Sequence, residues 1–138
     1  MRGEKWVYNL IIMSIIKSFR DLIVYQKAYN LSMRIFDISK SFPKAEQYSL
    51  TDQIRRSSRS VTSNIAESWA RKKYPKSFVY KLTDSLGEEM ETEGWLDYSR
   101  DFKYIENVTY EDLMVGYDEV RKMLISMINN PDKFCSDT

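Results

Sequence analysis

Histidine is absent from this 138-residue sequence, and cysteine occurs once, at Cys135. The first absence excludes Ser-His and Cys-His catalysis and histidine metal ligands. A single cysteine permits neither an internal disulfide nor a thiolate zinc site. Because nothing requires an oxidising compartment, we expect a cytoplasmic protein that is not an enzyme and binds no metal or other cofactor.

Glycine and proline are scarce as well, at four and three residues. Turn-rich β-sandwiches and barrels need more of both, and no glycine-rich loop is available to hold the phosphates of a small-molecule substrate. Apolar residues make up 43% of the chain and aromatic residues 14%, which argues against disorder. The composition favours a single domain of long helices.

No apolar run approaches the roughly 20 residues that span a bilayer, so we expect no membrane partner. The longest run, residues 10–16, is interrupted by Ser14 and is followed by no small-residue cleavage site. Two interpretations of the extension at residues 1–18 remain open. Either Met13 is the native start and residues 1–12 precede it, or the apolar run is an arm that packs on a neighbour.

Four helical segments follow, at about residues 19–40, 49–72, 75–102 and 109–129, and we expect one domain over residues 19–134 with a tail at 135–138. A serine or threonine with an aspartate three residues on predicts three N-terminal caps: Ser18 with Asp21, Ser49 with Asp52, and Thr109 with Asp112. Apolar residues at steps of three and four predict the core seams. The seams run through Val24, Ala28, Leu31 and Ile35; through Phe78, Leu82, Leu86, Met90 and Leu96; and through Leu113, Tyr117, Val120 and Leu124.

Helices of similar length joined by short connections predict an all-α fold, an antiparallel up-down-up-down four-helix bundle. Its charge is divided along the chain. Residues 1–76 hold 15 Lys/Arg against 6 Asp/Glu, a net of +9, whereas residues 77–138 hold 6 against 14, a net of −8. We therefore expect the basic and acidic residues to pair with each other, within the bundle or between copies, in preference to binding nucleic acid.

Several segments in order resemble the four-helix-bundle family of the 23S rRNA intervening-sequence protein. They are DLIVYQKA at residues 21–28, QIRRSS at 53–58, SNIAE at 63–67, ETEGWLD at 91–97, EVRKML at 119–124 and NPDKF at 130–134. The resemblance covers about residues 19–134. One departure is SWAR at residues 68–71, where the family usually has Gly-x-Gly-Arg, so we expect the second helix to run on further here.

The resemblance implies a bundle that assembles as a ring-shaped homopentamer. Some family members are encoded within inserts in large-subunit ribosomal RNA genes, and a distant branch serves diversity-generating retroelements by binding the reverse transcriptase and its RNA. Two functions are therefore open. One is a homo-oligomeric module that binds RNA or a ribonucleoprotein. The other is an adaptor for a protein partner such as a reverse transcriptase, with the basic residues used in subunit interfaces.

The candidate nucleic-acid surface is a set of basic residues in and after the second helix. Its members are Arg55, Arg56, Arg59, Arg71, Lys72 and Lys73. The alternative is that these residues pair with acidic groups of the third helix.

A second set, Arg56, Asn64, Glu67 and Glu91, is interpreted as a buried polar network that sets helix register. An acid/base or metal pocket is the other interpretation, but the sequence has none of the histidines that such sites in helical bundles use. Trp69 and Trp95 are candidate interface anchors.

Overall fold

The computed structural model describes Val7, Ile11 and residues 15–135, and within them it contains four long helices and no strand. The helices are α2 (Ile23–Ser39), α3 (Asp52–Ala70), α4 (Pro75–Asp101) and α5 (Asn107–Asn129). Short helical turns flank them at Phe19–Asp21, Lys44–Glu46, Gln47–Thr51 and Pro131–Lys133. The all-helical class is confirmed, whereas the question about residues 1–12 concerns a segment that lies mostly outside the described residues.

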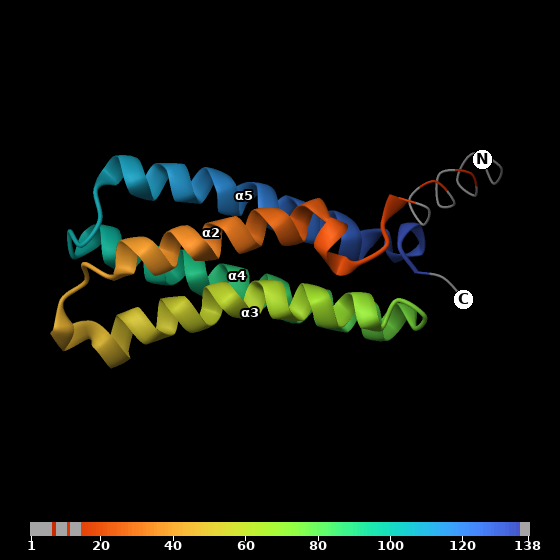
Figure 1. The fold of residues 1–138 in the computed structure, drawn as a ribbon, viewed down its shortest axis with the longest axis horizontal. Coiled ribbons are helices and arrows are strands. Elements are labelled where there is room, and N and C mark those ends of the chain that lie inside the picture. The colour runs from red at the N-terminus through yellow and green to blue at the C-terminus, as the bar shows by residue number, and fades with distance from the viewer. Residues whose placement is uncertain (1–6, 8–10, 12–14, 136–138) are drawn as a thin grey trace.

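The four helices lie side by side in one bundle (Figure 1). The α3–α4 turn lies at the end where the chain begins and finishes, and the α2–α3 and α4–α5 connections lie at the opposite end. Helix α3 packs against α2 and α4, and α5 packs against α4 and α2, so α2 and α4 are diagonal neighbours. The core runs the length of the bundle between them.

Three of the predicted seams can be compared with the buried residues. Those of α2 and α5 are confirmed, because Val24, Ala28, Leu31 and Ile35, and Leu113, Tyr117, Val120 and Leu124, are all buried. The α4 seam is wrong in its middle. Met90 is 51% exposed, and the buried positions between Leu82 and Leu96 are Ser85, Glu89 and Thr92. Ser85 and Thr92 hydrogen-bond there to Val61 and Ser57 of α3, a closeness of two helices that hydrophobicity does not reveal.

Only one of the three predicted caps forms, and it caps a different element. Ser18 and Asp21 make a reciprocal capping box, but it closes the turn Phe19–Asp21, and Leu22, in an extended conformation, separates that turn from α2. Ser49 donates instead to Glu46 Oε1, at 2.8 Å, one turn before α3 begins. The cap at Ser49 is therefore wrong, because Ser49 lies inside the helical turn Gln47–Thr51 that leads directly into α3.

The third cap is wrong as well, because α5 begins two residues before Thr109, at Asn107. Its expected partner Asp112 faces outward and pairs with Arg34 Nη2 at 2.7 Å. Helix α3 continues through Ser68, Trp69 and Ala70, and so through both positions where the family usually has glycine, and it ends at Ala70, two residues before the expected end at about residue 72.

Candidate functional site

The charge division of the sequence becomes a division across the bundle, with α2 and α3 basic and α4 and α5 acidic. Ion pairs join the two halves at Lys27–Glu119 (2.6 Å), Arg34–Asp112 (2.7 Å), Arg56–Glu91 (2.5 Å) and Lys81–Glu67 (2.7 Å). The predicted basic residues differ in whether they take part in such pairs, so the candidate site separates into distinct groups.

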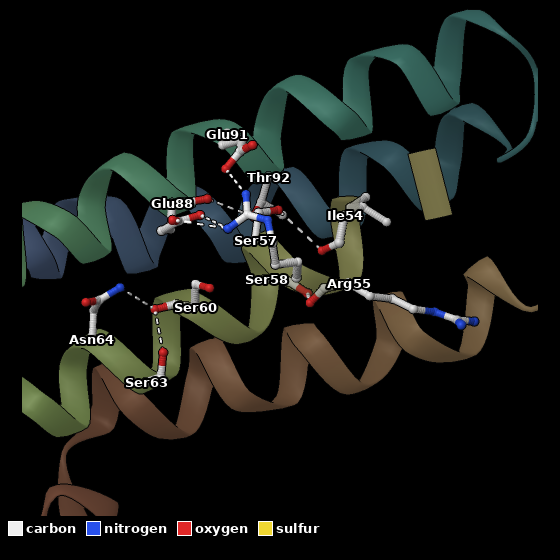
Figure 2. Close-up of polar contacts among 11 residues, drawn as sticks. Ile54, Arg55, Ser57, Ser58, Ser60, Ser63, Asn64, Glu88, Glu91 and Thr92 are labelled. Atoms are coloured by element: carbon white, nitrogen blue, oxygen red, sulfur yellow. Dashed lines mark hydrogen bonds and ion pairs between the residues drawn. The ribbon is translucent and has the colours of Figure 1, made fainter. Parts of the chain in front are cut away.

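Two carboxylates of α4, Glu88 and Glu91 (labelled in Figure 2), form ion pairs with Arg56. Arg56 Nη2 is 2.5 Å from Glu91 Oε2, and Arg56 Nη1 is 3.3 Å from Glu88 Oε2. Burial is the largest single influence on the pKa of Glu91 and raises it, but the hydrogen bonds from Arg56 and Glu88 and the positive charge of Arg56 together leave that pKa below its ordinary value. Below this cluster, Thr92 Oγ1 donates to Ser57 Oγ at 2.8 Å in the buried α3–α4 contact. The charge of Arg56 is therefore used in ion pairs between α3 and α4 of the same chain.

The predicted four-residue polar network is not one network in the structure. Arg56 and Glu91 are brought together, whereas Asn64 Nδ2 donates to the carbonyl oxygen of Ser60 on its own helix, at 2.9 Å. Glu67 pairs with Lys81 of α4, at 2.7 Å. Sequence spacing placed Asn64 and Glu67 on one side of α3 but did not reveal which partner each would find.

Charge reversal tests the Arg56–Glu91 pair. We expect Arg56→Glu to lower the free energy of unfolding by about 1 kcal/mol, because three carboxylates then face each other across a half-exposed site. Adding Glu91→Arg restores an opposite-charge pair and recovers most of the loss, measured by urea denaturation. The same reversals at Lys27 and Glu119, a similarly exposed pair in which the cation faces only one carboxylate, give the control and are expected to lower stability less. Equal losses in Arg56→Glu and the double variant would show that the two side chains are not coupled.

Arg55 and Arg59 form a second group, directed away from α4 and onto α2. Figure 2 shows Arg55 extending away from Glu88 and Glu91. Its Nε donates to Ser39 Oγ at 2.8 Å, and its guanidinium lies 4.7 Å from the centre of the Phe36 ring. Arg59 lies over the same ring at 5.8 Å. A recess of about 460 Å³ is lined by Arg55, Arg56 and Arg59 together with Asp52 and two serines.

A third group, the basic turn, consists of Arg71, Lys72 and Lys73 between α3 and α4. Lys72 Nζ lies 4.2 Å from the Trp69 ring centre, and Arg71 Nη1 donates to Ser77 Oγ at 3.2 Å. Within the described part of the chain, no carboxylate lies at ion-pair distance from any of the three. Tyr74 follows them and is 62% exposed. The turn is a cationic surface with an accessible aromatic ring.

The two candidate tryptophan anchors occupy different positions. Trp69 is buried in the core at the end of α3, beneath Lys72. Trp95 is partly buried against the core and contacts the Tyr98 ring, with 5.9 Å between ring centres. Within the chain both rings pack between helices, and a role in contacts between copies stays a prediction.

The carboxyl of Glu89, which was not among the predicted site residues, is a buried acidic group of the core. Its side chain is fully buried, and neither its oxygens nor the hydroxyl of Tyr117 has a hydrogen-bond partner among the described residues. Burial, and secondly the neighbouring Glu93, raise the pKa of Glu89 to about 9. The signal for it was present, because Glu89 falls on the three-four spacing that joins Leu82 to Leu96.

Nothing in the described residues supports a metal or membrane site. No three carboxylate or thiol groups there are close enough together to bind a metal ion, and no helix of that part has the length and apolar character for a membrane crossing.

The chain resembles proteins of one family. The sequence model described as "23S rRNA-intervening sequence protein" matches residues 20–126. A solved structure from Bacteroides thetaiotaomicron VPI-5482, a protein of unknown function from the S23 ribosomal protein family, is 30% identical with a TM-score of 0.69, over 78% of this chain and 96% of that one. No curated protein matches the sequence.

Proposed function

Because the chain belongs to the 23S rRNA-intervening sequence protein family, we propose that it is a non-enzymatic, cytoplasmic binding module that assembles into a homo-oligomer and binds RNA. Its helices run up-down-up-down, as the placement of successive connections at opposite ends of the bundle supports (Figure 1). A ring of five copies is the assembly that the family resemblance implies. No small-molecule substrate enters this proposal.

The basic turn is the observation that carries the RNA proposal. Arg56 is occupied by Glu88 and Glu91, and Arg55 by Ser39 and Phe36. Arg71, Lys72 and Lys73 follow one another in a single turn and have no carboxylate at ion-pair distance among the described residues, so all three charges can neutralise phosphates, which releases counterions and dominates binding to nucleic acid. The exposed ring of Tyr74 offers a stacking surface for an unpaired base.

Fluorescence anisotropy with a labelled RNA hairpin tests this site. We expect the logarithm of the association constant to fall linearly with the logarithm of salt concentration. The triple variant Arg71→Ala, Lys72→Ala, Lys73→Ala is expected to weaken binding at every salt concentration. It is also expected to reduce the slope by about 2 to 3, close to one for each phosphate that is no longer neutralised.

A matched control removes two exposed lysines away from the turn, through Lys44→Ala and Lys122→Ala, and is expected to leave the slope unchanged. Arg55→Ala with Arg59→Ala then shows whether the second group takes part. If the triple variant binds RNA as tightly as the wild type, with the same salt dependence, the basic turn is not the RNA site. No salt-sensitive binding by the wild-type assembly would remove RNA altogether.

The second candidate function is an adaptor that binds a protein such as a reverse transcriptase, with the basic residues in interfaces. It is favoured by the arrangement of Arg55 and Arg59, which lie on Phe36 beside the exposed side chain of Met33. Cations on an apolar surface suit a protein partner better than a phosphate backbone. An assembled protein that binds no RNA at low salt would favour this function.

A further inference from the structure

Helices α2 and α3 leave an open groove with an apolar wall and a cationic wall, here named the arginine groove. The apolar wall is Tyr29, Met33 and Phe36, which recur at steps of four and three along α2 and are 47%, 53% and 37% exposed. Arg55 and Arg59 of α3 form the other wall. A recess of about 340 Å³ opens between Met33, Phe36 and Arg59. Exposed apolar side chains grouped in this way indicate a protein-binding surface.

Helix α4 carries a complementary surface, here named the α4 outer face. Tyr80, Met90 and Tyr98 lie on it, 65%, 51% and 54% exposed. Gly87 and Gly94 flank Met90, and a Cβ added at either would meet nothing within 4 Å. The packing of this chain therefore does not require glycine at either position, although glycine disfavours a helix. Their effect is that Met90 projects between two positions without side chains.

The charges of the two surfaces are opposite. The arginine groove has Arg55 and Arg59 on its wall and Lys40 over Phe36. The α4 outer face is bordered by acidic residues at positions 84, 91, 97 and 101 and by basic residues at 76, 81 and 100, so its acidic excess is small. Of the acidic residues, Glu91 and Asp101 also form ion pairs within the chain, with Arg56 and Arg100. Apolar residues lie at the centre of each surface with charged residues around them, as in protein interfaces of the core-and-rim type.

The two surfaces lie on different sides of the bundle, because the groove is formed by α2 and α3, whereas the outer face belongs to α4, which is diagonal to α2. One copy cannot bury its groove on its own α4 face. A contact between two different surfaces repeats from copy to copy and closes into a ring when the rotation allows it, whereas a contact of one surface with itself stops at a dimer.

We propose that the arginine groove of one copy receives the α4 outer face of a second copy, head to tail, with Met90 packed against Met33 and Phe36. This inference rests on the self-assembly proposed above and names the surfaces that form it. Arg55 and Arg59 then serve the contact between copies, and the basic turn, at one end of the bundle, stays accessible to RNA.

Two single variants and their mixture test the pairing by sedimentation velocity. Met33→Lys damages only the groove, and Met90→Lys damages only the α4 face. We expect each variant alone to be monomeric at concentrations where the wild type assembles, because an unpaired buried ammonium weakens association about tenfold or more. Mixed in equal amounts, they are expected to form a one-to-one heterodimer and nothing larger, because one intact groove meets one intact face.

Val115→Lys, on a similarly exposed apolar residue of α5, is the matched control and is expected to assemble like the wild type. Circular dichroism confirms that each variant folds, and Tyr29→Lys with Tyr98→Lys provides a second pair. A monomeric wild type would overturn both this inference and self-assembly. Variants that assemble normally, or a mixture that stays monomeric, would overturn the named surfaces while leaving self-assembly in place.

Discussion

Glu89→Gln is expected to raise the free energy of unfolding by about 3 kcal/mol at pH 7. The wild-type carboxyl is fully buried without a hydrogen-bond partner among the described residues, and its pKa is raised to about 9 by burial and by Glu93. Tyr117, Asp118 and Arg121 of α5 also face it, and of these only Arg121 favours the charged form. The amide of glutamine has the same shape and is neutral at every pH.

The pH dependence follows from proton binding. The ordinary pKa of this group is 4.5 and its folded pKa is about 9, so between these values the folded chain binds more protons at Glu89 than the unfolded chain does. Its stability therefore falls as pH rises, by about 1.4 kcal/mol per unit, which amounts to about 3 kcal/mol between pH 4.5 and pH 7. The advantage of Glu89→Gln is expected to vanish near pH 4.

Urea denaturation at pH 4.5, 6, 7 and 8 measures this difference. Glu111→Gln makes the same substitution on the solvent face of α5 and is expected to change stability by less than about 0.5 kcal/mol at any pH. A constant difference between Glu89→Gln and the wild type across this range would show that Glu89 is not a neutral, buried acid at pH 7.

Arg121→Met is expected to lower the free energy of unfolding by about 2 kcal/mol. Arg121 Nη1 lies 2.7 Å from Glu93 Oε2, and the guanidinium also pairs with Asp118. The Glu93 side chain is only 19% exposed, so removing its cation leaves a poorly solvated carboxylate beside Glu89. Breaking a buried pair from one side costs about 3–5 kcal/mol, and partial exposure of both groups reduces that figure.

Adding Glu93→Gln to Arg121→Met is expected to recover at least half of the loss, because the unpaired carboxylate is then gone. Lys122→Met provides the matched control: it also pairs with Asp118, but its side chain is 73% exposed, so the expected loss is under about 0.5 kcal/mol. Urea denaturation compares the four proteins. Equal losses in Arg121→Met and Lys122→Met would contradict the interpretation of Arg121 as a buried partner.

The candidate site was predictable in part. The basic residues are visible in the sequence, and so is the excess of acid in the second half that pairs with some of them. The sequence does not say which arginine finds which partner. Arg55 and Arg56 are adjacent in sequence, yet successive helix positions are about 100° apart, so Arg56 reaches Glu91 while Arg55 bonds to Ser39.

The sequence by itself determined the helical class, the approximate extents of four helices and the seams of α2 and α5. It could do so because apolar residues at steps of three and four, and the scarcity of glycine and proline, are local properties that each segment shows on its own. The tertiary structure alone decided which residues fill the middle of the buried face of α4. Ser85 and Thr92, which hydrogen-bond to α3, and Glu89 are buried there and Met90 lies outside, because burial depends on the distance between helices as well as on hydrophobicity.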